Sequence, residues 1–171
     1  MLNKVLVYAG LLCTLTSTVV AVVEVIPGPG FPSLESLGLT SEELFAKGPL
    51  PALTSRITEL QKRYDNVCQT WSTGSVDNVI ACFNYLEALG TQACGVSGGP
   101  ESSVIMCTAG DAEVSGVNIS NEFSASSYCS NAVLGVQWIF TYRNNGGQVG
   151  GSAAANGNGN LVMSVDNVSW G

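Results

Sequence analysis

Five cysteines in the second part of the chain restrict its fold more than any other feature. They are Cys68, Cys82, Cys94, Cys107 and Cys129. In an oxidising compartment, cysteines so dense in a short stretch form a disulfide framework, and each bridge contributes roughly 2–4 kcal/mol by limiting the unfolded ensemble. Because five is an odd number, we expect two bridges and one unpaired thiol, and the spacing by itself leaves the pairing open.

The start of the chain predicts entry into such a compartment. A positively charged beginning leads into an apolar run from Val5 to Val23, and Val19 and Ala21 are small residues of the kind that signal peptidase prefers. We therefore predict a signal peptide over residues 1–21 and a secreted, extracellular protein. The alternative is an uncleaved membrane anchor.

Two sequons fit the same localisation. Asn118-Ile-Ser120 and Asn167-Val-Ser169 make Asn118 and Asn167 candidates for N-glycosylation. Each is a short match of a kind that also occurs by chance.

Residues 22–63 read as a proline-rich linker or propeptide. Five of the six prolines lie there, and the segment ends in the dibasic pair Lys62-Arg63, a candidate processing site. An ordinary charged helix end is the alternative. Short helices are expected from Thr40, where Glu43 completes a capping arrangement, and over 54–63.

The remaining residues, 64–171, fit one small domain. The pattern predicts a helix that starts after Ser75 and ends at Gly90, followed by strands over 91–96 and 102–108 that pair through a Ser-Gly-Gly-Pro turn. Such a hairpin would bring Cys94 and Cys107 within bridging reach.

A further strand is expected over 111–118, then a central buried helix from Ser124 or Ser126 to Tyr142, then two strands around the turn at 156–160. The predicted fold is α+β, in the order α-β-β-(β)-α-β-β. An antiparallel sheet with both helices packed on one face, stapled by disulfides, is the natural arrangement of these elements.

The charged residues exclude several functions. The chain has no histidine and a formal net charge of −7, and beyond residue 63 it has no lysine and a single arginine, Arg143. A Ser-His-Asp triad, a Cys-His pair and a lysine Schiff base are therefore excluded from the domain, and nucleic acid is an unsuitable partner. We also expect no metal and no cofactor. Asp111 and Glu113 resemble a glycosidase pair, but a solvent-facing acidic edge is the favoured interpretation.

Carbohydrate recognition remains possible for such a composition. Trp71, in a polar segment, is the aromatic residue most expected to be exposed, and Asn156, Asn158 and Asn160 offer side-chain amides in a turn. Sugars bind to flat apolar surfaces next to oriented polar groups. The alternative is that these asparagines serve turn geometry alone.

Several segments resemble small cysteine-rich secreted proteins of basidiomycete fungi, some of which bind glycans. The similar stretches are 81–94, 104–110, 125–129, 136–138 and 151–162. A more distant similarity is to fungal killer toxins and necrosis-inducing effectors. The resemblance implies the same order of helices and strands, and we take from it the pairs Cys94 with Cys107 and Cys82 with Cys129. Cys68 is then unpaired, since Tyr142-Arg-Asn144 stands where a further cysteine is expected.

Residues and resemblance together predict a secreted, non-enzymatic, lectin-like protein that binds a cell-surface glycan or glycoprotein in defence or interaction between organisms. The alternative is a toxin-like effector with a protein target. No oligomeric state is implied.

Overall fold

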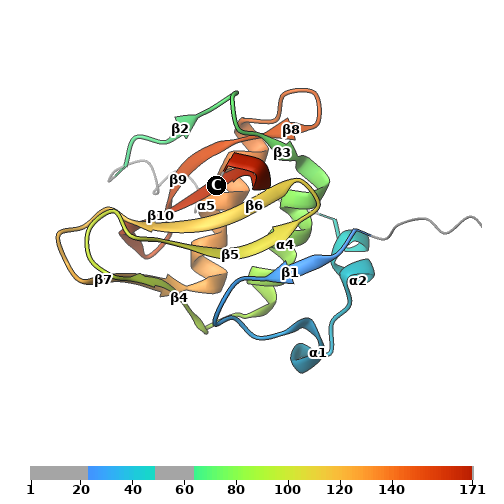
Figure 1. The fold of residues 1–171 in the computed structure, drawn as a ribbon, viewed down its shortest axis with the longest axis horizontal. Helices are drawn as coiled ribbons and strands as arrows, with labels where there is room; N and C mark the ends of the chain where they lie inside the picture. Colours follow the sequence, from blue (N-terminus) through green and yellow to red (C-terminus); the bar gives the residue numbers. More distant parts are fainter. Residues whose placement is uncertain (1–22, 49–63, 171) are drawn as a thin grey trace, which may run out of the picture.

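The structure, a computed structural model, describes residues 23–48 and 64–170 (Figure 1). Its centre is a six-stranded antiparallel sheet in the order β1-β5-β6-β10-β9-β2. The strands are β1 Val25–Pro27, β5 Ser103–Ala109, β6 Ala112–Asn118, β10 Asn158–Asn167, β9 Gly151–Ala155 and β2 Val67–Cys68. Helices α4, Val76–Ala88, and α5, Cys129–Tyr142, pack against one face, behind the sheet in Figure 1. The predicted α+β fold is confirmed.

Smaller elements surround this centre. Two short ladders pair β3 with β8 and β4 with β7. Their bounds are β3 Gly74–Ser75, β8 Gln148–Val149, β4 Ala93–Ser97 and β7 Ser124–Tyr128, and the other elements are α1 Leu34–Leu37, α2 Ser41–Ala46 and the 3-10 helix η2 Val168–Trp170. None of the helices within 23–48 and 64–170 is long and apolar enough to cross a membrane.

Helix α4 forms where the apolar spacing predicts it. Its N-cap residue Ser75 makes no side-chain capping hydrogen bond. Instead, an Oδ1 atom of Asp111, at the turn between β5 and β6, accepts from the Ser75 N–H at 2.9 Å and from the Asn78 side chain at 2.7 Å. A carboxylate at a helix N-terminus also complements the helix dipole. Gly90 follows the helix with φ of 58°, as predicted.

The predicted hairpin of 91–96 with 102–108 is wrong. Strand β4 pairs with β7, with Val96 opposite Ala125, whereas β5 pairs with β1 and β6. Residues 124–128 are therefore a strand, and α5 begins only at Cys129. Alternation and turn residues specify a strand but not its partner, and here β4 and β5 each pair with another strand. The expectation that α5 is a central buried helix is confirmed, since residues 132–140 are all buried.

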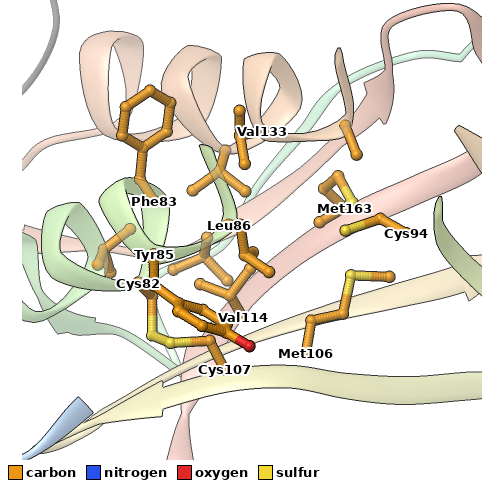
Figure 2. Close-up of a cluster of buried hydrophobic side chains, with 14 of the residues drawn as sticks. Cys82, Phe83, Tyr85, Leu86, Cys94, Met106, Cys107, Val114, Val133 and Met163 are labelled. Carbon is orange, nitrogen blue, oxygen red and sulfur yellow. A yellow bond between two sulfur atoms is a disulfide. The ribbon is translucent and has the colours of Figure 1, made fainter. Parts of the chain in front are cut away.

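The predicted disulfide pairing is also wrong. The bridges are Cys82–Cys107 and Cys94–Cys129, with Cα–Cα distances of 5.6 and 4.8 Å. Because β4 pairs with β7, Cys94 of β4 lies next to Cys129, the first residue of α5. Cys107 of β5 then bonds to Cys82 of α4. Figure 2 shows the first bridge in the core beside Tyr85 and Leu86. Cys68 is free and exposed, as predicted.

Residues 23–48, expected as linker or propeptide, pack on α4 and β5. Strand β1 is an edge strand, a position that tolerates its proline. Thr40 and Glu43 form the predicted capping box at the start of α2. The helix expected over 54–63 and the pair Lys62-Arg63 lie outside the described residues.

Candidate functional site

The structure separates the predicted glycan-binding residues into two groups. Trp71 is 63% exposed in the segment between β2 and β3. That segment lies near the end of α5, since Gln69 and Tyr142 line one hollow. The Asn156-Gly157 turn lies near the start of α5, where the Asn156 N–H donates to the Asn131 carbonyl. A helix of this length separates the two places by about 20 Å.

A hollow of about 300 Å³ lies beside the asparagine turn. It is lined by Ala93, Ser126, Ser127, Tyr128, Asn131 and Gly157. The turn's polar groups serve mainly to hold the turn in place. The Asn158 side chain donates to the Ser126 carbonyl at 2.9 Å and accepts from the Asn160 N–H at 3.0 Å. The Ser127 hydroxyl donates to the Asn156 carbonyl at 2.6 Å. Of the three asparagines, Asn160 is the exposed one.

A larger hollow of about 510 Å³ lies at the other end of α5, and we name it the α5-end hollow. It is lined by Cys68, Gln69, Thr70, Thr73, Tyr142, Arg143, Asn144, Asn145 and Gln148. Most of these side chains carry amides or hydroxyls. Trp71 follows Thr70 in the sequence and is not itself among the lining residues. Donors and acceptors of neutral charge next to aromatic rings suit a polyhydroxylated ligand.

Two residues of this hollow, Tyr142 and Arg143, contact the Trp138 ring. The Arg143 guanidinium carbon lies 4.7 Å from the Trp138 ring centroid, and the Trp138 and Tyr142 rings lie 5.5 Å apart. Trp138 is buried, whereas Tyr142 is 50% exposed. The buried indole thus contacts both a cation and a partly exposed phenol ring.

A smaller hollow of about 190 Å³ adjoins Arg143. It is lined by Tyr64, Asp65, Asn66, Trp138 and Arg143. Within the described residues, the Asn66 side-chain amide and the Arg143 Nε atom are buried without hydrogen-bond partners. Buried polar atoms are normally paired with protein, water or ligand.

The predicted carboxylate pair is not an isolated pair in the structure. Asp111 holds the start of α4, whereas Glu113 lies opposite Asp166 in the ladder of β6 with β10. Burial raises the pKa of Glu113, and the Asp166 charge raises it further. Sequence reasoning missed Asp166 because the partner strand was not specified. In residues 23–48 and 64–170, no three His, Cys, Asp or Glu side chains group in a way that could hold a metal ion.

Both sequon asparagines have structural roles. Asn118 is fully buried, and its side-chain amide donates to the carbonyls of Gly99 and Glu122 at 3.0 and 2.9 Å. A glycan on this nitrogen does not fit this fold, so the prediction for Asn118 is wrong. Asn167 is half-buried and donates to the Thr73 carbonyl at 3.0 Å. Each asparagine also accepts from the serine two residues later, a local turn motif that explains the spacing.

Sequence reasoning missed Tyr142, Arg143, Asn144 and Gln148 as site residues. The available signal was the polar run that directly follows an apolar helix. By itself, such a run indicates only the end of a helix.

Comparison with known proteins places the domain in a family. The sequence model of a protein family described as a domain of unknown function, DUF8794, matches residues 61–167. No curated protein and no solved structure matches the chain. The match covers the α5-end hollow and leaves residues 23–48 outside.

Proposed function

The chain belongs to the DUF8794 family, and we propose that it is a secreted, non-enzymatic protein that binds carbohydrate in the α5-end hollow. The ligand is a cell-surface glycan or glycoprotein, met in defence or in interaction between organisms. The asparagine turn predicted from the sequence is a secondary contact in this proposal.

One observation carries the proposal: an exposed aromatic ring stands beside a hollow lined with neutral amides. The half-exposed ring of Tyr142 offers an apolar face to the C–H side of a sugar. Asn144 uses its Oδ1 atom to accept from the Gly147 N–H at 2.9 Å, and Gln148 uses its Oε1 atom to accept from Thr73 at 3.3 Å. These hydrogen bonds use only the side-chain oxygens, so the amide N–H groups of both residues can donate to the hydroxyl oxygens of a sugar.

The charge of the protein favours a neutral sugar. A formal net charge of −7 repels polyanions, and Arg143 is the one cationic side chain beyond residue 63. Its Nε atom is buried and has no hydrogen-bond partner among the described residues. This arrangement suits one polar contact within a mainly uncharged glycan.

The same proposal includes secretion and processing. The two disulfides are typical of an oxidising compartment. Removal of residues 1–21 by signal peptidase and a cut after Lys62-Arg63 belong to this proposal. Asn167 remains the candidate for N-glycosylation.

A glycan array with the purified secreted protein tests the function. We expect binding to a subset of neutral glycans, and we expect Tyr142→Ala and Trp71→Ala each to weaken it at least about tenfold, since aromatic contacts commonly contribute more than 1 kcal/mol. Phe123→Ala is the matched control, because Phe123 is 73% exposed and lies outside both hollows. Its binding should equal that of the wild type.

Two outcomes contradict the proposal. If Tyr128→Ala abolishes binding while Tyr142→Ala does not, the ligand occupies the hollow beside the asparagine turn. If the folded protein binds no glycan, the alternative of an effector with a protein target becomes the better hypothesis.

A further inference from the structure

Residues 23–48, which we name the arm, fill a groove on the rest of the protein. The groove, which we name the arm groove, is formed by α4 and the edge of β5. In Figure 1 the arm is the blue part of the ribbon, with β1 beside β5 and α2 near α4. The arm lies outside the family match over 61–167. It contains no cysteine, so neither disulfide joins it to the domain.

The backbone of the arm completes the central sheet. Strand β1 is antiparallel to β5, with Val25 opposite Ala109 and Pro27 opposite Cys107. Beyond the strand, the Gly28 N–H donates to the Met106 carbonyl at 2.9 Å. A Cβ atom at Gly28 would lie 1.9 Å from the Ile105 carbonyl oxygen, so the arm approaches β5 as closely as a backbone can. Without the arm, the β5 edge has unpaired backbone groups.

Polar side chains of α4 also depend on the arm. The Asn84 side-chain amide donates to the Leu44 carbonyl at 2.9 Å and to the Gly48 carbonyl at 3.1 Å. The Tyr85 hydroxyl donates to the Pro32 carbonyl at 2.7 Å. Asn84 and Tyr85 are fully buried. Removing the arm would break all three hydrogen bonds and open the core around Asn84 and Tyr85 to water.

Apolar contacts extend the same interface. Val25 and Leu44 of the arm are 1% and 2% exposed and belong to the hydrophobic core. Other arm residues that pack against the core are Phe31, Leu34, Leu37, Leu39 and Phe45. An ion pair of Lys47 with Glu87, at 3.2 Å, lies at the surface and adds little. The arm therefore binds as a piece of the core, not as a loose leader.

We propose that the arm stays bound in the arm groove after the chain is cut at Lys62-Arg63, so that the processed protein is a non-covalent complex of two chains. A dibasic-specific endoprotease supplies the cut. Water adds across the peptide bond between Arg63 and Tyr64, which leaves a carboxylate on Arg63 and an amine on Tyr64. The occupant of the groove is this chain's own segment, held by the contacts above.

The test begins with the full secreted chain. It is digested with a dibasic-specific endoprotease and analysed by size-exclusion chromatography and intact mass, in native buffer and in denaturant. We expect the cut protein to elute with the uncut protein in native buffer and to separate into two chains only in denaturant. An arm that elutes separately in native buffer overturns the proposal, and so does a chain that the protease leaves uncut.

Variants test whether the named contacts hold the arm. Asn84→Leu removes both amide donors at similar size, and after cutting it should release the arm at least about tenfold faster than the wild type. Uncut Asn84→Leu keeps its arm tethered and should elute as the wild type does. Asn158→Leu is the matched control, since it removes an amide-to-carbonyl hydrogen bond far from the arm.

A second variant guards against a folding defect in the first. Gly28→Ala changes only the arm and sets a Cβ atom against the Ile105 carbonyl. It should also release the arm at least about tenfold faster after cutting. Equal release from both variants and the wild type overturns the assignment of the groove.

Discussion

Glu113 and Asp166 face each other across the ladder of β6 with β10. The two carboxylates are not equivalent. The Asp166 carboxylate accepts from the Gln69 side chain and, at 2.6 Å, from the Ser164 hydroxyl. Glu113 differs, since burial and the Asp166 charge raise its pKa. Like charges directly opposite each other destabilise a ladder.

We expect Glu113→Gln to make the protein more stable at pH 7. The pKa of Glu113 in the folded state lies above its ordinary value of 4.5, so ionisation in the folded protein costs stability as pH rises above that value. The gain from Glu113→Gln should therefore shrink as pH falls below 4.5. Urea unfolding at pH 7 and pH 4 measures it. Glu122→Gln, at an exposed carboxylate, is the control. If Glu113→Gln is less stable than the wild type at pH 7, repulsion between Glu113 and Asp166 does not destabilise the fold.

Tyr85→Phe should change the stability of the protein at alkaline pH. Burial raises the pKa of Tyr85 to about 12 from 10.0. A folded pKa above the unfolded one means that this tyrosine supports the fold fully below pH 10 and loses that contribution as pH rises toward 12. Because phenylalanine does not ionise, the stability of Tyr85→Phe should fall less than that of the wild type as pH rises above 10. At pH 7 the variant loses the hydrogen bond to the Pro32 carbonyl, roughly 1 kcal/mol. Denaturant unfolding across pH 7–11 compares it with Tyr128→Phe, and identical curves for both variants would refute the effect.

Loss of either disulfide should destabilise the domain. The bridges close loops with sequence separations of 25 and 35, for which chain entropy predicts about 3–4 kcal/mol each. Urea unfolding compares the wild type with two double variants, each of which lacks one bridge: Cys82→Ala with Cys107→Ala, and Cys94→Ala with Cys129→Ala. Cys68→Ser, at an exposed free thiol, should stay within about 0.5 kcal/mol of the wild type. Mass mapping of unreduced peptides checks the pairing, and linked peptides with Cys94 and Cys107 would contradict it.

Asn118→Ala should lower the free energy of unfolding by about 1–3 kcal/mol, because it leaves the carbonyls of Gly99 and Glu122 and the N–H of Ser120 without their partner. Asn121→Ala, at an exposed position nearby, should have little effect. Urea unfolding measures both. Intact mass of the secreted protein provides a second readout, and a glycan at Asn118 would contradict the structural role.

Local signals in the sequence predicted local structure well. Apolar spacing with Gly90 at the end gave helix α4, and Thr40 with Glu43 gave the capping box of α2. These features depend on neighbours three or four residues apart, whose interactions are the same in most folds. Cys68 as the free thiol was also predicted, although on a pairing that is wrong.

The candidate site was predicted in part. Trp71 is exposed beside the α5-end hollow, but the asparagine turn lies at the other end of α5. Tyr142 and Arg143 come together with Gln69 only because β2 pairs with β9 and brings its loop to the end of α5. Gln69 lies more than 70 positions from Tyr142 and Arg143 in the sequence, so no local pattern could have shown that they meet.

By itself, then, the sequence determined the α+β class, the two helices, and a domain that lacks histidine and lysine. The tertiary structure alone decided that β4 pairs with β7, that Cys82 bonds to Cys107, and that the arm is part of the core. The physical reason is that helix spacing and composition are properties of neighbouring residues. The choice of partner among equally apolar strands is made by packing and hydrogen bonds between residues far apart in the chain.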